Sequence, residues 1–385
     1  MNSVIEKHLE EYSQEPSLIV EVPGVSVLFG EFADYCKGYS ICAANDLKLS
    51  IGISKREDSL VKMCNTFSGD HKRFSLSGIK YRKEDRWGNF VKGLVLSLQN
   101  SNAQLSGMNI TFTGTLLASD TETVASAIGI GVAIGLNKMF NLGMDSSQIV
   151  RHVFQSSTGF CQEGCKYMTL ITMLEAQENN LLLFDNQQVT NRSIEFVNGS
   201  PDYRFCMIES RIPPLAMREE LTFKAGAMKR AFEILKRNYP NVNLRDVPES
   251  ELSERVIQID EESRQICSYI LDESKTAREA FRCFESGDSQ AIGKLLNKVQ
   301  KGLRDKLDLT CPEVDWLVKR ANEITGCFGA CMIPTGLSGS ILVIMNSNAL
   351  DSYKERLTDY EHIFGFSARL KDFHCQGCAA VVRSL

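Results

Sequence analysis

The sequence predicts an α+β protein, because strand-like and helix-like segments follow one another without strict alternation. Short β-branched runs dominate the first half of the chain. Apolar residues recur at helical spacing in the middle, and charged helical segments follow them. The 385 residues are enough for one large domain or two ordinary ones.

The first half of the chain holds most of the expected strands. A strand over 109–113 ends at Gly114, and a buried helix rich in small and branched apolar residues follows over 121–140, with Ser119 or Asp120 as its N-cap. This order of strand, turn and helix can place backbone N–H groups at an anion. The other expected strands cover 18–22, 25–29, 47–53 and 74–77.

The second half is mainly helical. No repeat, low-complexity tract or Pro/Gly-rich linker marks a domain boundary in it. A strand over 340–345 follows a glycine-containing turn, and a last strand covers 379–382. The expected helices cover 219–239, several charged segments within 250–306, and 350–360.

Composition limits the function classes. The formal net charge of −5 gives no electrostatic reason to expect binding to nucleic acid or to an anionic membrane. The polar, acidic residues 1–18 lack the pattern of a signal peptide, and the longest apolar stretch, 128–136, is too short to span a bilayer. Thirteen scattered cysteines, an odd number, indicate reduced thiols. We therefore expect a soluble, cytoplasmic protein.

One segment carries a recognisable motif. Residues 23–46, PGVSVLFGEFADYCKGYSICAAND, resemble the galactokinase signature, which has the form P-G-R-x-N-L-I-G-E-H-x-D-Y-x-x-G. Two later segments resemble the same family in the same order, namely WGNFVKG (87–93) and CPEVDWLV (311–318). The positions that agree with the signature are Pro23, Gly24, Leu28, Gly30, Glu31, Asp34, Tyr35 and Gly38.

The resemblance covers about residues 18–385 and implies the GHMP kinase fold. That fold has an N-terminal domain with a ribosomal-S5-like β–α–β unit and a C-terminal ferredoxin-like domain, with the active site between them. On this basis we expect a polar extension at 1–17, an N-terminal domain at 18–200 and a C-terminal domain at 201–385.

The resemblance also implies a sugar site. Galactokinases transfer the γ-phosphoryl group of ATP to the C1 hydroxyl of galactose, and their signature carboxylates hold sugar hydroxyls. Glu31, Asp34 and Tyr35 are the matching residues here. A structural interpretation stays open beside this one: Glu31 caps local backbone, Asp34 begins a turn before Gly38, and Tyr35 packs.

The two residues that the family uses for chemistry are absent. Phosphoryl transfer depends on positioning and charge stabilisation. The arginine of the signature is replaced by Val25, and its histidine by Phe32. Counting back from the segment LLLFD (181–185) places Thr169 at the position of the catalytic aspartate. Rescue by Glu163 or Glu175 stays open, although neither has the matching spacing.

The nucleotide-binding motifs are altered as well. The family's phosphate loop, G-x-G-L-S-S-S-A, corresponds to GTLLASDT (114–121). Gly114, Ser119 and Asp120 are what remains of it. Leu116 replaces the second glycine, and we expect it to obstruct phosphate, while Asp120 and nearby Glu122 add repulsion. The third motif, IPTGLSG (333–339), keeps two glycines.

Three hypotheses follow. The first is a galactokinase-like pseudoenzyme that binds galactose, a related sugar or a protein partner. The second is an active sugar 1-kinase that uses substitute residues. The third is an interaction protein that binds neither ligand. We expect no cofactor, and Mg-ATP only under the second hypothesis. No metal site is expected, because the single pair Cys375 and Cys378 lacks the second pair of a closed zinc site.

Overall fold

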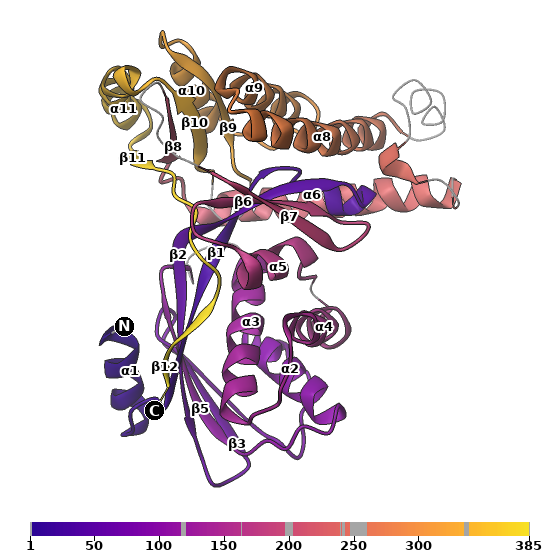
Figure 1. The fold of residues 1–385 in the computed structure, drawn as a ribbon, viewed down its shortest axis with the longest axis vertical. Coiled ribbons are helices and arrows are strands. Elements are labelled where there is room, and N and C mark those ends of the chain that lie inside the picture. The colour runs from indigo at the N-terminus through magenta and orange to yellow at the C-terminus, as the bar shows by residue number, and fades with distance from the viewer. Residues whose placement is uncertain are drawn as a thin grey trace. The chain divides into compact units, whose positions relative to one another are not determined.

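The computed structural model describes residues 2–116, 121–162, 164–196, 203–238, 240, 243–246, 260–334 and 339–384. The chain forms two compact units, each built from separated segments (Figure 1). Unit 1 contains Met1–Val25, Ala44–Glu178 and Gln376–Leu385, and unit 2 contains Ser26–Ala43 and Asn179–Cys375. The domain border expected at residue 200 stays a prediction.

Unit 1 is a β-sheet with helices on both faces. Its strand order is β12-β1-β2-β5-β3-β4, in which β3 and β5 run parallel. The strands are β1 (Leu18–Phe29) and β2 (Tyr39–Lys55), which both continue into unit 2, with β3 (Leu60–Asn65), β4 (Asp70–Ser75), β5 (Met108–Gly114) and β12 (Ala380–Ser384). The helices are α1 (Asn2–Tyr12), α2 (Gly88–Asn100), α3 (Thr121–Met139), α4 (Ser146–Gln155) and α5 (Tyr167–Glu175).

Neighbouring residues of β2 show how the two faces are covered. A Cβ atom on Gly131 of α3 would lie 2.4 Å from Ile51 Cδ1, so α3 packs directly on the Ile51 face. A Cβ atom on Gly52 would lie 3.2 Å from Val4 Cγ2 of α1. Because successive strand residues point to opposite faces, α1 and α3 cover opposite sides of the sheet, as Figure 1 shows.

Unit 2 has its own antiparallel sheet, in the order β11-β8-β10-β9. These strands are β8 (Arg204–Glu209), β9 (Cys327–Met332), β10 (Ile341–Met345) and β11 (Arg369–Asp372). Two further strands, β6 (Asn180–Asp185) and β7 (Thr190–Glu195), pair with each other, and β6 pairs with the first residues of β2. The helices are α6 (Pro214–Asn238), α8 (Glu261–Ser286), α9 (Ser289–Asp305), α10 (Pro312–Asn322) and α11 (Leu350–Phe364).

Helix α9 is fixed to the edge of this sheet by polar side chains. Asn297 Oδ1 accepts a hydrogen bond of 3.0 Å from Ala330 N, and Gln300 Oε1 accepts one of 2.8 Å from Met332 N. Side chains of α9 therefore accept hydrogen bonds from the backbone amides on the outer side of β9. This covering protects the edge of the sheet from pairing with another chain.

The α+β class predicted from the sequence is confirmed. The strand expected over 109–113 is β5, and the helix expected over 121–140 is α3. The runs 18–22 and 25–29 form a single strand, β1. Both proposed N-caps of α3, Ser119 and Asp120, lie outside the described residues. Within the described residues, no helix combines the length and apolar character needed to cross a membrane.

Candidate functional site

The loop that joins β1 to β2 carries the signature residues and belongs to unit 2. Gly30 has a φ of +78°, and a Cβ atom there would lie 2.2 Å from the carbonyl oxygen of Tyr39. At Gly38, a Cβ atom would lie 2.1 Å from Ser274 Oγ. Both glycines are therefore required by the backbone path of the loop itself, whether or not a ligand binds.

Substituting Gly38 tests this requirement. We expect Gly38→Ala to destabilise the protein by about 1–3 kcal/mol, the usual cost of forcing an extra methyl group into packed surroundings. Gly78→Ala is the matched control, because no atom would lie within 4 Å of its new Cβ. Urea denaturation of both variants measures the difference. Equal stabilities would contradict the close approach of the loop to Ser274.

A buried carboxylate of α8 holds the same loop. Glu273 Oε1 accepts hydrogen bonds from the backbone N–H groups of Gly30, at 3.0 Å, and Glu31, at 3.3 Å. The pKa of Glu273 is raised to about 7, first by burial and then by the nearby carboxylate of Glu31, while the two backbone donors act in the opposite direction. Two buried carboxyl groups, Glu31 and Glu273, therefore share this end of the loop.

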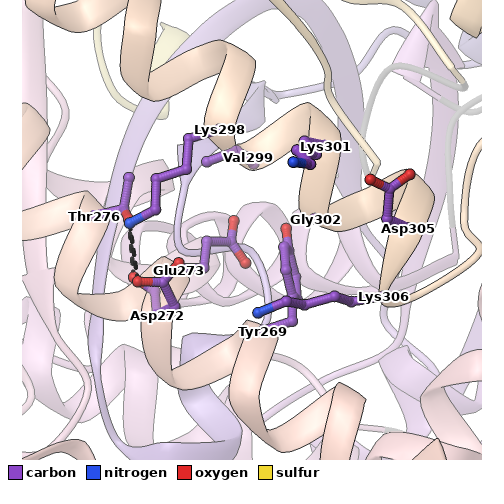
Figure 2. Close-up of a pocket in the computed structure, with 10 residues that line it drawn as sticks. All are labelled: Tyr269, Asp272, Glu273, Thr276, Lys298, Val299, Lys301, Gly302, Asp305 and Lys306. Carbon is purple, nitrogen blue, oxygen red and sulfur yellow. Dashed lines mark hydrogen bonds and ion pairs between the residues drawn. The ribbon is translucent and has the colours of Figure 1, made fainter. Parts of the chain in front are cut away.

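Glu273 also faces a cavity of about 230 Å³ between α8 and α9 (Figure 2). Its Oε2 atom and the hydroxyl of Tyr269 are buried and have no hydrogen-bond partner within the described residues. Lys298 forms an ion pair of 2.9 Å with Asp272 at one side of the cavity. The remaining lining residues are Thr276, Val299, Lys301, Gly302, Asp305 and Lys306.

The other signature side chains lie in a short 3-10 helix, Ala33–Cys36. The Tyr35 hydroxyl donates a 3.3 Å hydrogen bond to Ala225 O, and its ring stacks on Phe232, both in α6. Phe32, at the family's histidine position, is buried in the core of unit 2. Asp34 is half-buried in the same turn. Tyr35 is thus engaged in packing, while its predicted sugar contact stays a prediction.

The far end of the loop is fixed by an arginine. Arg245 Nη1 donates to Asp185 Oδ1 at 2.6 Å and to the backbone oxygen of Lys37 at 3.3 Å. Its guanidinium group lies 4.8 Å from the centre of the Tyr39 ring. The loop is consequently held by a carboxylate at its start and by a guanidinium group at its end.

In unit 1, the two positions that the sequence analysis aligned with the family's arginine and aspartate hold buried, uncharged side chains. Val25 is 3% exposed and Thr169 is 2% exposed. Thr169 lies in the first turn of α5, where its hydroxyl donates a 3.1 Å hydrogen bond to Glu122 Oε2 of α3. Glu122 Oε1 accepts from Lys166 N at 2.9 Å and from Ser126 Oγ at 3.0 Å. Glu122 therefore ties the start of α3 to the start of α5.

Glu163 and Glu175 were considered in the sequence analysis as substitutes for the catalytic aspartate. Glu175 ends α5, six residues after Thr169, which corresponds to about 9 Å along a helix. Its side chain is exposed, whereas Thr169 is buried. Glu163 lies outside the described residues. The carboxylate next to Thr169 is that of Glu122, which the sequence analysis had considered only as a source of repulsion.

The phosphate loop is described in part. Gly114 has a φ of +135°, and the Thr115 hydroxyl accepts a 3.1 Å hydrogen bond from Lys48 N. The Leu116 side chain is completely buried, and its expected obstruction of phosphate stays a prediction. Ser119, Asp120 and residues 335–338 of the third motif lie outside the described residues. In the described part, Thr115 contacts β2 and Leu116 is buried.

The other segments that resemble the family have structural roles. In WGNFVKG, Lys92 is buried, pairs with Asp85 and donates to the backbone oxygen of Lys80. In CPEVDWLV, Asp315 accepts hydrogen bonds from Gln300, at 3.2 Å, and Thr310, at 3.1 Å. These contacts position α2 and α10 within the fold.

The two cysteines near the C-terminus, Cys375 and Cys378, differ in their exposure to solvent. Cys375 is buried, whereas Cys378 is exposed, and all thirteen cysteines are free. Burial raises the pKa of Cys375 to about 12, so its thiol is protonated at neutral pH.

Sequence reasoning missed the roles of Glu122, Arg245 and Glu273. All three are charged residues whose partners lie far away in sequence. The hydrogen bond between Gly30 and Glu273 joins residues 243 positions apart. The spacing of residues within a short segment of sequence cannot indicate a contact of this kind.

Comparisons with known proteins agree with the resemblance. The sequence model of the galactokinase galactose-binding signature matches residues 6–55. The chain is 28% identical, over 99% of its length and 97% of the relative, to a Treponema pallidum protein provisionally named galactokinase. It is 24% identical to the galactokinase of Roseiflexus sp., over 93% of this chain and 90% of that protein.

The fold agrees as well. The structure of Lactococcus lactis galactokinase complexed with galactose superposes with a TM-score of 0.86 at 18% identity, covering 98% of this chain and 99% of that one. The mevalonate kinase of Methanococcus jannaschii superposes with a TM-score of 0.60 at 18% identity, over 94% and 98% of the two chains. The chain is therefore a galactokinase-like protein with the fold of the GHMP kinases.

Proposed function

We propose that this protein is a pseudoenzyme: a galactokinase-like fold that binds a galactose-like sugar without transferring phosphate to it. The observation that carries the proposal is the pair of positions Val25 and Thr169. Both are buried and uncharged, where the family has an arginine and an aspartate.

The expected loss of rate is large. Removing one preorganised charge from a phosphoryl-transfer site costs roughly 10²–10⁵ in rate. Valine has no group that interacts with a phosphate, and threonine does not accept a proton at neutral pH. The Thr169 hydroxyl is in addition engaged by Glu122. With both positions changed, we expect no sugar phosphorylation above background.

Sugar binding is supported separately. The signature model that matches residues 6–55 is one for galactose binding, and the Lactococcus lactis galactokinase is complexed with galactose. Glu31 is held in a loop whose backbone is fixed by Glu273 and Arg245. We propose Glu31 and Asp34 as sugar-binding residues, with Tyr35 supporting the loop.

One observation favours an active kinase as a second candidate. The Glu122 carboxylate lies 3.1 Å from Thr169 Oγ1, so a carboxylate is present beside the catalytic position although it belongs to α3. In this case Glu122 would accept the proton of the sugar hydroxyl. The candidate still lacks a cation in place of Val25. Its three hydrogen-bond donors also make the Glu122 carboxylate a weaker base.

A coupled assay for ADP release separates the two candidates. With galactose and Mg-ATP, the purified protein is expected to release no ADP beyond a control without sugar. A thermal-shift titration with galactose is expected to raise the melting temperature, because a ligand at 100 times its Kd adds about 2.7 kcal/mol to stability.

Each result has a defined meaning. ADP release that depends on galactose and is abolished by Glu122→Gln would overturn the pseudoenzyme and establish the second candidate. If galactose leaves the melting temperature unchanged, sugar binding is excluded. The result would then favour the third hypothesis, an interaction protein that binds neither ligand. A shift that persists in Asp34→Ala would reject Asp34 as a sugar-binding residue.

A further inference from the structure

Three side chains that bind metals in proteins meet on unit 1, whereas the signature loop belongs to unit 2. Cys64 of β3 and His71 of β4 are directly opposite each other in this antiparallel pair. Glu11 of α1 approaches from the helix that covers this side of the sheet. One ligand atom from each residue lies within 4.8 Å of the other two, and among the described residues this is the single group of its kind.

The backbone places these residues without help from a metal. Cross-strand neighbours in an antiparallel pair have Cβ atoms about 4.5–5.5 Å apart, so β3 and β4 hold Cys64 and His71 together. Helix α1 is docked by His8, whose ring nitrogens lie 2.9 Å from Thr111 Oγ1 and 2.9 Å from Ser54 Oγ. Tyr12, next to Glu11, donates a 3.1 Å hydrogen bond to Ile110 O.

We propose that Glu11, Cys64 and His71 bind one zinc ion. Thiolate, imidazole and carboxylate are the side-chain ligands that zinc uses, whereas magnesium and calcium select oxygen ligands alone. Tetrahedral bonds of about 2.0–2.3 Å place ligand atoms about 3.5 Å apart. Side-chain rotations that move the ligand atoms by about 1 Å bring them to the separations of a tetrahedral zinc site. Water is the fourth ligand.

Zinc binding replaces contacts that are individually weak. His71 Nε2 and Glu11 Oε2 lie 2.9 Å apart in a pair whose side chains are 55% and 33% exposed, and such surface pairs contribute about 0–1 kcal/mol. The Cys64 thiol is buried beside them and releases its proton when it binds the metal. The zinc ion joins α1 to the β3–β4 hairpin and so fixes the N-terminal helix to the sheet.

Cobalt replaces zinc as a spectroscopic probe. The full-length protein is first stripped with a chelator and then titrated with Co²⁺. We expect one equivalent to bind, with ligand-field bands in the visible and a thiolate-to-cobalt charge-transfer band in the near ultraviolet. Zn²⁺ is expected to displace the cobalt and abolish both features.

The variants test each ligand. Cys64→Ser is expected to remove the charge-transfer band, and His71→Asn to weaken zinc binding by at least about 100-fold, more than the loss of an outer partner of a ligand typically costs. Glu11→Gln, at the surface, is expected to weaken binding without affecting folding. Cys378→Ser is the matched control, because it removes an exposed thiol from the other cysteine-containing motif and is expected to leave binding unchanged.

Stability provides a second measurement. Zinc is expected to raise the melting temperature of the natural protein and of Cys378→Ser, and to leave that of Cys64→Ser unchanged. A natural protein that binds no cobalt or zinc at millimolar metal overturns the proposal. So does a charge-transfer band that survives in Cys64→Ser and disappears in Cys378→Ser, since the metal then binds at the C-terminal cysteines.

Discussion

Replacing Glu273 by alanine is expected to destabilise the protein by about 2–4 kcal/mol. The substitution removes the acceptor of two hydrogen bonds, from the N–H groups of Gly30 and Glu31, and an unsatisfied buried donor costs about 1–3 kcal/mol. The loss is offset in part, because the variant no longer buries a carboxyl group near Glu31. Urea denaturation at pH 6 measures the difference.

Glu273→Gln is the matched control, because glutamine keeps an acceptor oxygen for the loop and carries no charge. Its stability relative to the natural protein is expected to depend on pH. The pKa of Glu273 is about 7 in the folded protein and 4.5 for an unperturbed glutamate, with Glu31 as the neighbouring charge that raises it. Between these values the folded state binds more protons than the unfolded state, so stability falls as the pH rises.

The contribution of Glu273 is therefore complete below about pH 4.5 and is lost as the pH rises through about 7. The free energy of unfolding of Glu273→Gln, minus that of the natural protein, is expected to increase across this window, by up to about 3 kcal/mol. A difference that stays constant from pH 4 to 8 would show that folding does not shift the pKa of Glu273.

The resemblance predicted the fold well, because the matching residues are those that the backbone requires. Gly30 and Gly38 each permit a close approach that any other side chain would block, and such requirements are local enough to appear as a motif. Asp315 and Lys92 are similar cases, since each supports the start or packing of one helix. The requirements of the fold alone are enough to explain these residues.

The environment of the chemical positions was less predictable. Thr169 was identified by counting along the chain, but its partner Glu122 is 47 residues away on another helix. Likewise, the sequence did not indicate that the Leu116 side chain is completely buried. Which way a side chain points depends on tertiary contacts, and a single sequence contains no direct record of them.

Placing an aspartate at position 169, as the resemblance implies for the family, is expected to destabilise this protein because Glu122 lies beside that position. The aspartate carboxylate would lie near the Glu122 carboxylate, at the place where the Thr169 hydroxyl now donates a 3.1 Å hydrogen bond. Position 169 is buried, so the repulsion is poorly screened by water. We expect Thr169→Asp to lose about 3 kcal/mol at pH 8, within the range found for uncompensated buried charges.

Two further variants separate repulsion from simple loss of a hydrogen bond. Thr169→Val keeps the shape and loses the hydroxyl, so it is expected to cost about 1 kcal/mol. Combining Thr169→Asp with Glu122→Gln removes the like charge and supplies an amide donor, and we expect the double variant to recover at least about 1.5 kcal/mol relative to the sum of the single effects. Additive effects would mean that the two positions do not interact. Recovery would mean that, in this chain, a carboxylate at 122 is incompatible with one at 169, so that the aspartate cannot return by a single substitution.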